Sequence, residues 1–245
     1  RDLHLSIRRQ RQMCIRDRED IEELIYIWKN SNNKRTKNKE GPICSDIIDF
    51  TPSPLSKIRD RIYFDENLFP NSKIYHGMFF YTKTPHIIHN DDVVVEVPKG
   101  SIFQSKMPLM YKGFNIPLEY EGEQNPHLLF FDQFYIEGHG KFFNNEKDII
   151  KINNRHGREK YKNVPIFEYS EVLGTSTEPF DCEIKEKYLS HIKDEWLEGL
   201  SFNSIHEWIP GNITIFDCYR LHCASNFRKL NIKSKLGISI FTEHK

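Results

Sequence analysis

His89 and Asp91 are the residues of this chain whose types and spacing best suit metal chemistry. They stand two positions apart in the run PHIIHNDDVVVEVP, and side chains two apart on a β-strand project from the same face of the sheet. An imidazole nitrogen beside a carboxylate oxygen provides two of the three ligands of a facial set on a transition metal. The pair therefore predicts a metal centre that a distant histidine completes.

His222 is the candidate for that third ligand because of the sequence on either side of it. The run WIPGNITIFDCYRLHCASNFRKLNIKSKLGISIFTE has the order turn, strand, histidine, polar loop, basic residue and final strand. Its Pro-Gly pair favours the turn, and Asn212–Cys218 is the predicted strand. We expect His222 just past the body of this strand, where it can meet a metal that another strand holds.

Other residues offer alternative ligands, and a single His-x-Asp arises readily by chance in a chain with 11 histidines. The alternative histidines are His86, His127, His139, His191 and His206. None of them has a carboxylate two residues later, so we expect structural or surface roles for them. Cys218 and Cys223 flank the region of His222, but soft thiolates favour zinc or copper, so we expect these two side chains to pack in the core.

Three features together resemble the 2-oxoglutarate- and Fe(II)-dependent dioxygenases, and loosely their phytanoyl-CoA hydroxylase-like branch. They are His89-Asn90-Asp91, the run from Pro210-Gly211-Asn212 through Phe216-Asp217 to His222, and a basic residue near the start of the final strand. The resemblance covers residues 72 to 243. It implies that His89, Asp91 and His222 hold Fe(II) and are the catalytic residues.

The same resemblance implies the reaction. 2-Oxoglutarate and O2 are consumed, succinate and CO2 are released, and an unactivated C–H bond of a small-molecule substrate is hydroxylated. Family members that halogenate replace the carboxylate ligand with a small residue, so Asp91 favours hydroxylation. The implied cofactors are Fe(II), 2-oxoglutarate as cosubstrate, and O2.

A basic residue that grips the distal carboxylate of 2-oxoglutarate is also implied. Lys235 stands 13 residues after His222, whereas Arg228 stands only six after it and is expected in a solvated turn, so we favour Lys235. Many relatives place arginine here, and lysine provides a point charge in place of a two-pronged fork. Ser239 shares the strand face of Lys235 and can reach the same carboxylate. Asn115, on another predicted strand, is a further candidate to bind the cosubstrate.

The elements that must position these residues are mainly strands. Short runs rich in β-branched and aromatic residues alternate with Pro, Gly and Asn turns, as in a sandwich or barrel. We expect a double-stranded β-helix core of the jelly-roll or cupin-like kind, with flanking helices. The predicted strands are Ile74–Thr82, Ile87–Val97, Gly113–Tyr120, His127–Tyr135, Val164–Tyr169, Asn212–Cys218 and Leu236–Thr242. The predicted helices are Asp17–Lys29, Leu55–Tyr63 and Glu183–Leu197, the last covering the outside of a sheet.

A chain of 245 residues can bury the core of one domain, and its segments differ in character. Residues 1–18 are basic and aperiodic, which predicts a non-native or disordered leader. Residues 19–71 are expected to form N-terminal helices and a linker. Residues 72–245 are expected to form the oxygenase core, with an insert at 121–205.

Composition limits the partners. Basic and acidic residues number 35 each, so no net charge draws the protein to nucleic acid or to an anionic membrane, and a small-molecule substrate is favoured. No apolar run reaches the roughly 20 residues that a membrane helix needs. Five cysteines without a CxxC pair argue against a disulfide framework. We expect a soluble, cytoplasmic protein with reduced thiols.

Two rival interpretations stay open at this point. A cupin-like metal-binding isomerase or ligand-binding protein would have the same β core but would not use 2-oxoglutarate. A non-catalytic interaction module would keep only a relic of the site. Lys235 distinguishes the first rival, because its charge matters greatly only if 2-oxoglutarate binds. Binding of Fe(II) and 2-oxoglutarate distinguishes the second.

Overall fold

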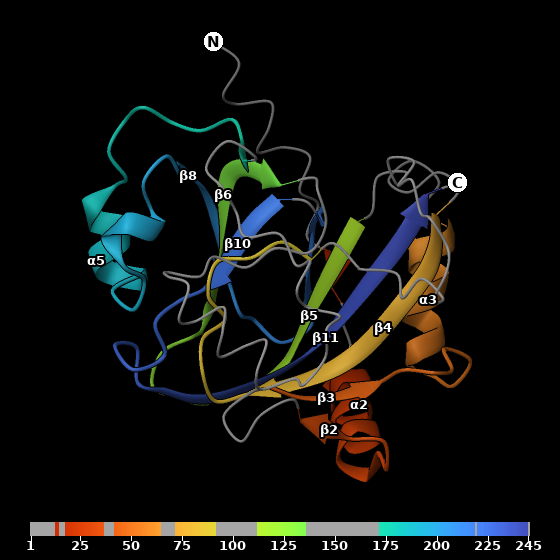
Figure 1. Cartoon of the computed structure of the whole chain (residues 1–245). Coiled ribbons are helices and arrows are strands. Elements are labelled where there is room, and N and C mark those ends of the chain that lie inside the picture. Colours follow the sequence, from red (N-terminus) through yellow and green to blue (C-terminus); the bar gives the residue numbers. More distant parts are fainter. Residues whose placement is uncertain are drawn as a thin grey trace, which may run out of the picture.

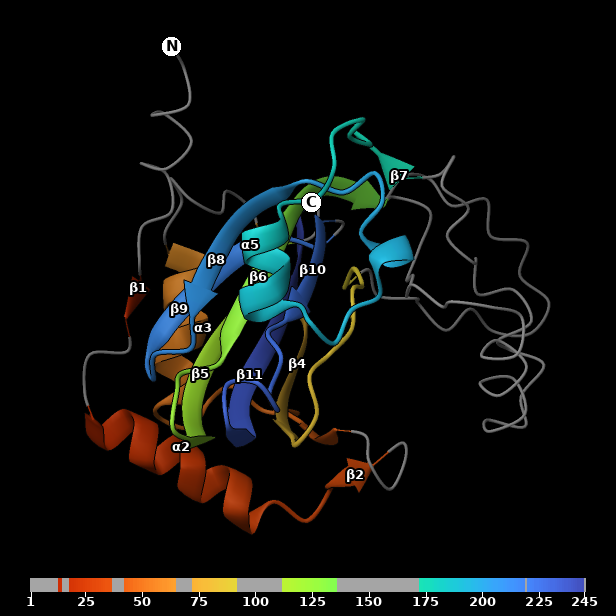
Figure 2. The same cartoon turned by 90° about the vertical axis from the view of Figure 1, so that its left-hand side faces the viewer.

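Two antiparallel sheets face each other in the part of the chain that the computed structural model describes (Figures 1 and 2). The described residues are 13–14, 18–36, 42–64, 72–91, 112–135, 172–218 and 220–244. Both sheets contribute to an apolar layer between them, which includes Leu128 and Phe130 from one sheet and Phe216 from the other. The interior between the sheets is therefore part of the core.

The larger sheet has β11 at its centre, where it pairs with β4 on one side and β5 on the other along most of its length. Beyond β5 the sheet continues through β9, and beyond β4 it continues through β3. In spatial order the strands are β1 (Met13–Cys14), β9 (Asn212–Asp217), β5 (Lys112–Gly122), β11 (Ile232–His244), β4 (Ser72–Thr82), β3 (Ile43–Asp46) and β2 (Arg35–Thr36).

The second sheet is built around β6, which pairs with β10, β8 and β7. Its strands are β6 (His127–Tyr135), β7 (Val172–Leu173), β8 (Phe202–Glu207) and β10 (Arg220–Ala224). His89 forms an isolated antiparallel bridge with His222 of β10. The segment that carries His89 is thereby joined to this sheet.

The chain passes back and forth between the two sheets. β4, β5, β9 and β11 lie in the larger sheet, whereas the His89 segment, β6, β8 and β10 lie in the second. Antiparallel strands that alternate in this way between two facing sheets form a jelly roll, or double-stranded β-helix. The predicted fold class, mainly β with flanking helices, is confirmed.

Two N-terminal helices cover the outer face of the larger sheet (Figure 1). α2 (Arg18–Asn30) and α3 (Leu55–Phe64) match the predicted helices to within one residue at each end. Leu24 of α2 and Ile58 of α3 belong to one apolar cluster with Ile238 of β11. Because side chains alternate along a strand, the neighbours of Ile238 in sequence face the opposite way, into the interior.

The predicted helix Glu183–Leu197 is two shorter pieces. α5 (Cys182–Tyr188) starts behind Asp181, whose carboxylate accepts hydrogen bonds from the backbone N–H groups of Glu183 and Ile184. A 3-10 turn, η3 (Asp194–Trp196), follows. The apolar stripe that predicted one helix packs on the outside of the second sheet, with Leu189 and Ile192 buried and Ile184, Tyr188 and Trp196 partly buried. Such a stripe does not require the helical backbone hydrogen bonds to continue from α5 to η3.

The expected insert at 121–205 was too wide. β6 lies inside this range and is the central strand of the second sheet, and β8 begins at Phe202, so both belong to the core. β8 and β10 were not predicted, because polar residues interrupt their short apolar alternation. The predicted strand Val164–Tyr169 lies outside the described residues, as does Ile87–Val97 beyond Asp91. From Ile87 to Asp91 the prediction of a strand was wrong, because the structure has only an isolated bridge at His89 there.

The stretch expected to be a non-native or disordered leader contains one described pair of residues that joins the fold. Met13 and Cys14 form β1 and pair antiparallel with Ile213 and Asn212 of β9. The other residues of 1–17 lie outside the described part of the chain. The boundary at residue 18 therefore does not separate the fold from everything before it.

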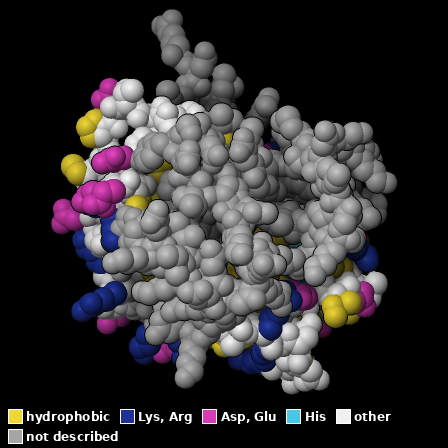
Figure 3. All heavy atoms as spheres, in the orientation of Figure 1, with side chains coloured by type: hydrophobic (Ala, Val, Ile, Leu, Met, Phe, Trp, Pro, Cys, Tyr) yellow, Lys and Arg dark blue, Asp and Glu magenta, His cyan; other side chains and the backbone are white. Residues whose placement is uncertain are grey.

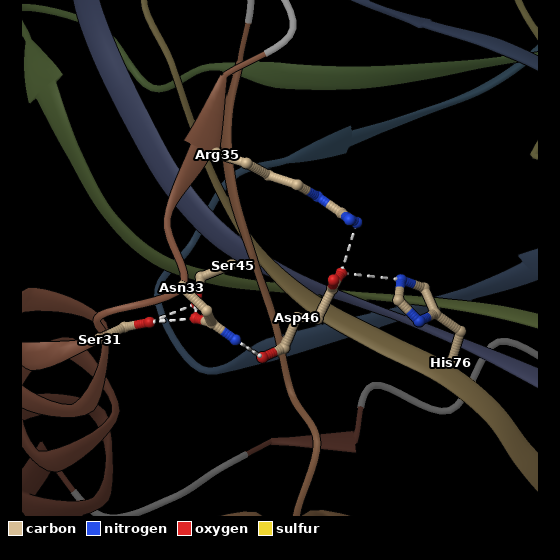
Figure 4. A network of polar contacts seen from close by, with 6 residues as sticks. All are labelled: Ser31, Asn33, Arg35, Ser45, Asp46 and His76. Atoms are coloured by element: carbon tan, nitrogen blue, oxygen red, sulfur yellow. Dashed lines mark hydrogen bonds and ion pairs between the residues drawn. The ribbon is translucent and has the colours of Figure 1, made fainter.

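A polar network ties the segment after α2 to the edge of the larger sheet (Figure 4). Asp46 of β3 accepts a hydrogen bond from Arg35 of β2 at 2.7 Å and lies 3.4 Å from His76 Nε2 of β4. Asn33 donates to the backbone carbonyl of Asp46 at 3.0 Å. Ser31 and Ser45 complete the network. These contacts hold the linker along the short edge strands of the sheet.

In the view of Figure 3, side chains of both signs are visible around the margin of the molecule, with Asp and Glu at the upper left and Lys and Arg mostly below them. This mixture agrees with the equal numbers of basic and acidic residues in the sequence. None of the helices in the described ranges is long and apolar enough to cross a membrane.

Gly237 of β11 is required where Trp208 lies against the strand. A Cβ at Gly237 would lie 2.6 Å from Cζ2 of Trp208 and 3.0 Å from the backbone carbonyl oxygen of Ile116. Gly237→Ala is therefore expected to lower the free energy of unfolding by roughly 1–3 kcal/mol, since both neighbours are fixed. Chemical denaturation measures the change. The exposed Lys233→Ala on the same strand is the control and should cost much less; equal costs would contradict the argument.

Candidate metal centre

His89, Asp91 and His222 bring their ligand atoms together, all within 4.8 Å of one another. His89 Nε2 lies 3.4 Å from one carboxylate oxygen of Asp91, and His222 Nε2 lies 3.2 Å from the other. Two imidazole nitrogens and a carboxylate thus converge from segments 131 residues apart. The structure assembles the predicted ligand set, although His222 lies within strand β10 and not past the end of a strand.

Backbone pairing fixes the separation of the three side chains. The N–H of His89 donates to the carbonyl of His222 at 3.0 Å, and the N–H of His222 donates back to the carbonyl of His89 at 2.9 Å. The N–H of Asp91 donates to the carbonyl of Cys218 at 2.8 Å. Because the two histidines are directly opposed in a hydrogen-bonded antiparallel pair, their side chains project from the same face and their rings lie side by side, with centroids 4.3 Å apart.

Each imidazole ring is oriented by a carbonyl of its own segment. Nδ1 of His89 lies 2.7 Å from the carbonyl oxygen of Ile87, and Nδ1 of His222 lies 2.9 Å from that of Arg220. A carbonyl can only accept a hydrogen bond, so Nδ1 is the protonated nitrogen in both rings. Nε2 is therefore the nitrogen left for a metal, as in metal sites whose second nitrogen is held by a backbone carbonyl.

The surroundings of the triad are apolar, and its carboxylate stays ionised. His89 and His222 are only 6% and 2% exposed, and the rings of Phe130 and Phe216 lie 5.5 and 4.9 Å from that of His222. Burial alone would raise the pKa of Asp91, but the charge of His222 and hydrogen bonds from both histidines outweigh it and hold the pKa well below 3.8. A negative charge is thus in place for a cation.

The donor set fits Fe(II). Two neutral imidazoles and one carboxylate on one side of an ion form the facial arrangement typical of non-haem iron, and no thiolate belongs to this group among the described residues. Cys218 and Cys223 are both fully buried, and burial raises the pKa of Cys223, which keeps that sulfur protonated. Both cysteines pack against apolar residues, as predicted.

Lys235 is a buried amine in an aromatic cage. It is 5% exposed, and its Nζ lies 4.1 Å from the ring centroid of Trp208 and 5.8 Å from those of Phe80 and Phe227. Burial lowers the pKa of Lys235 to about 7. Among the described residues, no hydrogen bond or ion pair reaches Nζ. The side chain lies near the protonated thiol of Cys223, the neighbour of His222.

The other predicted cosubstrate residues differ in their placement. Ser239 lies on the same side of β11 as Lys235, and it is directly opposite Asn115 of β5. Both are buried, and Oδ1 of Asn115 has no hydrogen-bond partner among the described residues. Arg228, in contrast, is exposed in the turn between β10 and β11. The structure brings Ser239 and Asn115 together in the interior but does not bring Arg228 there.

His86 is the residue near the metal ligands whose place the sequence did not reveal. It was one of five alternative histidines expected to have structural or surface roles, yet its Nδ1 lies 3.5 Å from Nε2 of His89. No carboxylate follows it at a spacing of two, so its sequence carries no ligand signal. Its nearness to His89 depends on the turn that follows β4.

The chain is similar to known proteins in structure but not in sequence. No family model and no curated protein matches the sequence. Solved structures do match, and one is an oxidoreductase of the 2OG-Fe(II) oxygenase family from Burkholderia pseudomallei, which is 8% identical, with 93% of this chain and 79% of that chain covered and a TM-score of 0.43. This is the family that the sequence resembles.

Two further matches are described as binding or depending on 2-oxoglutarate. HygX from Streptomyces hygroscopicus, solved with nickel and 2-oxoglutarate, is 9% identical, with 100% of this chain and 87% of that chain covered and a TM-score of 0.46. SnoN, an alpha-ketoglutarate-dependent non-heme epimerase from nogalamycin biosynthesis, is 10% identical, with coverages of 99% and 82% and a TM-score of 0.49. Because these identities are so low, any conclusion about function must be based on the residues of this chain.

Removal of the carboxylate ligand is expected to abolish tight metal binding. Asp91→Asn should weaken the affinity for Co(II) by at least ~100-fold. Loss of a residue that only hydrogen-bonds to a metal ligand typically costs about 10- to 100-fold in metal affinity, and loss of a ligand itself should cost more. Titration followed by the visible absorption of Co(II) measures it. Asp132→Asn, an exposed carboxylate bonded to Ser201 and Asn203, is the control and should bind Co(II) as the wild type does. Equal affinities for Asp91→Asn and the wild type would exclude this site.

Replacement of the buried lysine is expected to stabilise the protein. The pKa of Lys235 is about 7 when folded and 10.5 when unfolded, so the unfolded chain holds more protons between these values and stability rises with pH there. Lys235→Met should raise the free energy of unfolding at pH 7 by roughly 1–3 kcal/mol. It should also remove part of the gain between pH 7 and pH 10.

Denaturation at both pH values measures this effect, with the exposed Lys233→Met as the control. A variant at Lys235 that is less stable than the wild type at pH 7 would show that the amine is compensated within the fold.

Proposed function

We propose that this chain is an Fe(II)- and 2-oxoglutarate-dependent oxygenase that hydroxylates a C–H bond of a small-molecule substrate. The observation that supports this most strongly is the combination, in one jelly roll, of a His-Asp-His set with a buried lysine that has no ion-pair partner among the described residues. Held by three ligands on one side, Fe(II) supplies open positions for a chelating 2-oxo acid and for O2. One molecule each of 2-oxoglutarate, O2 and substrate then gives succinate, CO2 and the hydroxylated product.

Each of the candidate site residues has a distinct role in this proposal. His89, Asp91 and His222 hold the metal, and the carbonyls behind the two histidines keep Nε2 directed at it. Lys235 binds the distal carboxylate of 2-oxoglutarate, and the rings of Trp208, Phe80 and Phe227 exclude water around that ion pair.

Two neighbouring polar groups assist Lys235 in this proposal. The hydroxyl of Ser239 and the amide of Asn115 face the interior from adjacent strands and are available to hydrogen-bond the cosubstrate. Arg228, the other candidate anchor, is exposed and stays outside the site.

Lys235 separates this function from that of a cupin-like isomerase or simple ligand-binding protein. A buried amine without an anionic partner destabilises the fold, and such groups occur mainly at functional sites, where a bound ligand provides the partner. The carboxylate of a 2-oxo acid is a partner of the right charge. A metal-binding protein that does not use 2-oxoglutarate has no need for this lysine.

The substrate and the compartment are also part of the proposal. Basic and acidic residues balance over the whole chain, which favours a small molecule over nucleic acid. Cys44, Cys182, Cys218 and Cys223 are not joined by disulfides, which suits a reducing cytoplasm.

The test is succinate formation from 2-oxoglutarate by the Fe(II)-loaded protein in air, with and without a panel of small metabolites. We expect the wild type to form succinate and one class of metabolite to stimulate it. His222→Ala should abolish turnover, and Lys235→Met should raise the apparent Kd for 2-oxoglutarate by at least ~10-fold, the loss of a charge-assisted hydrogen bond. His191→Phe, which replaces a partly buried histidine outside the metal group, is the control.

Anaerobic addition of 2-oxoglutarate to the Fe(II) protein provides a second readout, a visible charge-transfer band. No succinate and no band from the wild type would overturn the proposal. Normal 2-oxoglutarate affinity in Lys235→Met would favour the cupin-like alternative.

A further inference from the structure

His86 lies beside the metal ligands without being one of the triad. Its Nδ1 is 3.5 Å from Nε2 of His89, and the two rings meet edge to face, with centroids 5.0 Å apart and planes inclined by 75°. Within the triad, Nε2 of His89 lies 3.4 Å and Nε2 of His222 lies 3.2 Å from the carboxylate oxygens of Asp91. A nitrogen of His86 is thus as near to a ligand atom as the ligand atoms are to each other.

The backbone fixes His86 by the same pairing that fixes the triad. Its carbonyl accepts a hydrogen bond from the N–H of Ala224 at 3.0 Å, two residues beyond His222 on β10. Pro85, just before it, has a fixed φ and restricts the chain where it leaves the turn after β4. His86 is partly exposed, whereas His89 and His222 are buried, so a small molecule can reach its ring.

Metal binding changes what faces His86. In the metal-free protein, Nδ1 of His86 contacts Nε2 of His89, at a length that makes a weak hydrogen bond. When that nitrogen becomes a metal ligand, it can neither donate to His86 nor accept from it. With a metal held there, Nδ1 of His86 would lie beside this ligand nitrogen, where it could contact a molecule that binds the metal from solution.

We propose that His86 is a binding residue for this external ligand, and that its Nδ1–H donates a hydrogen bond to the anion bound at the metal beside His89. In the proposed oxygenase reaction, on which this inference rests for the identity of the anion, the acceptor is a carboxylate oxygen of the 2-oxo acid. The hydrogen bond fixes which open position the carboxylate takes. A hydrogen bond to a charged acceptor contributes a factor of roughly 10 or more to affinity.

Direct coordination by His86 is the competing role. A fourth protein ligand would occupy one of the positions that a chelating 2-oxo acid and O2 require. The His86 nitrogens also fall outside the group of ligand atoms that lie within 4.8 Å of one another. The two roles differ in what the loss of the ring does, because a ligand affects metal affinity and a hydrogen-bond donor affects anion affinity.

The experiment uses the Co(II)-loaded protein and two probes, azide and 2-oxoglutarate, followed by visible absorption. His86→Phe keeps a ring of similar shape without the donor, and His86→Asn returns an N–H near the position of Nδ1. His191→Phe is the matched control, since it removes a histidine that is partly buried, as His86 is, and lies outside the metal group. Thermal unfolding checks that each variant is folded.

We expect His86→Phe to bind Co(II) within about threefold of the wild type but to bind azide and 2-oxoglutarate at least ~10-fold more weakly, with partial recovery in His86→Asn. A loss of Co(II) affinity of tenfold or more in both folded variants would identify a metal ligand and overturn the proposal. Unchanged affinity for both anions would overturn it as well. If the wild type binds azide but not 2-oxoglutarate, the proposed oxygenase function fails, while the azide affinities still decide the role of His86.

Discussion

The pair of backbone hydrogen bonds between His89 and His222 is the interaction on which the candidate site depends. It joins a segment that follows β4 to β10, and so connects two parts of the chain that the sequence separates widely. The register of this bridge sets the ring separation, directs both Nε2 atoms at the Asp91 carboxylate and brings His86 alongside. A shift of one residue would turn each of these side chains to the other face of the sheet. The geometry of the candidate metal centre therefore depends first on the backbone pairing and only then on the chemistry of the side chains.

A second constraint acts on the opposite sheet. Lys235 occupies the inward face of β11, the central strand, and Gly237 two residues later leaves room for Trp208 to lie against the strand. The aromatic rings around the amine replace water without supplying a counter-charge. The fold thus holds a cation at a cost in stability on one wall of the interior and a carboxylate with two imidazoles on the other. An anion that reached both the candidate metal site and the lysine would meet a positive group at each end.

Much of this arrangement was predictable from the sequence, for identifiable reasons. His89 and Asp91 follow from the two-residue period of a strand, and β4, β5, β6, β9 and β11 follow from long runs of alternating or apolar residues. β8 and β10 are short and mix polar with apolar residues, so their strand character depends on pairing with β6, a contact distant in sequence. For the same reason His222 was expected beyond a strand and not within one. His86 could not be placed, because the turn after β4 determines where its ring lies.

The carbonyls that orient the two metal-binding rings come from Ile87 and Arg220, each two residues before the histidine that it holds. The orienting group is backbone in both cases, so any side chain at these two positions provides it. Substitutions at Ile87 and Arg220 should therefore leave both rings oriented as they are, provided that the backbone pairing of the two segments is kept. The geometry of the candidate site is in this sense insensitive to the identity of the residues that orient it.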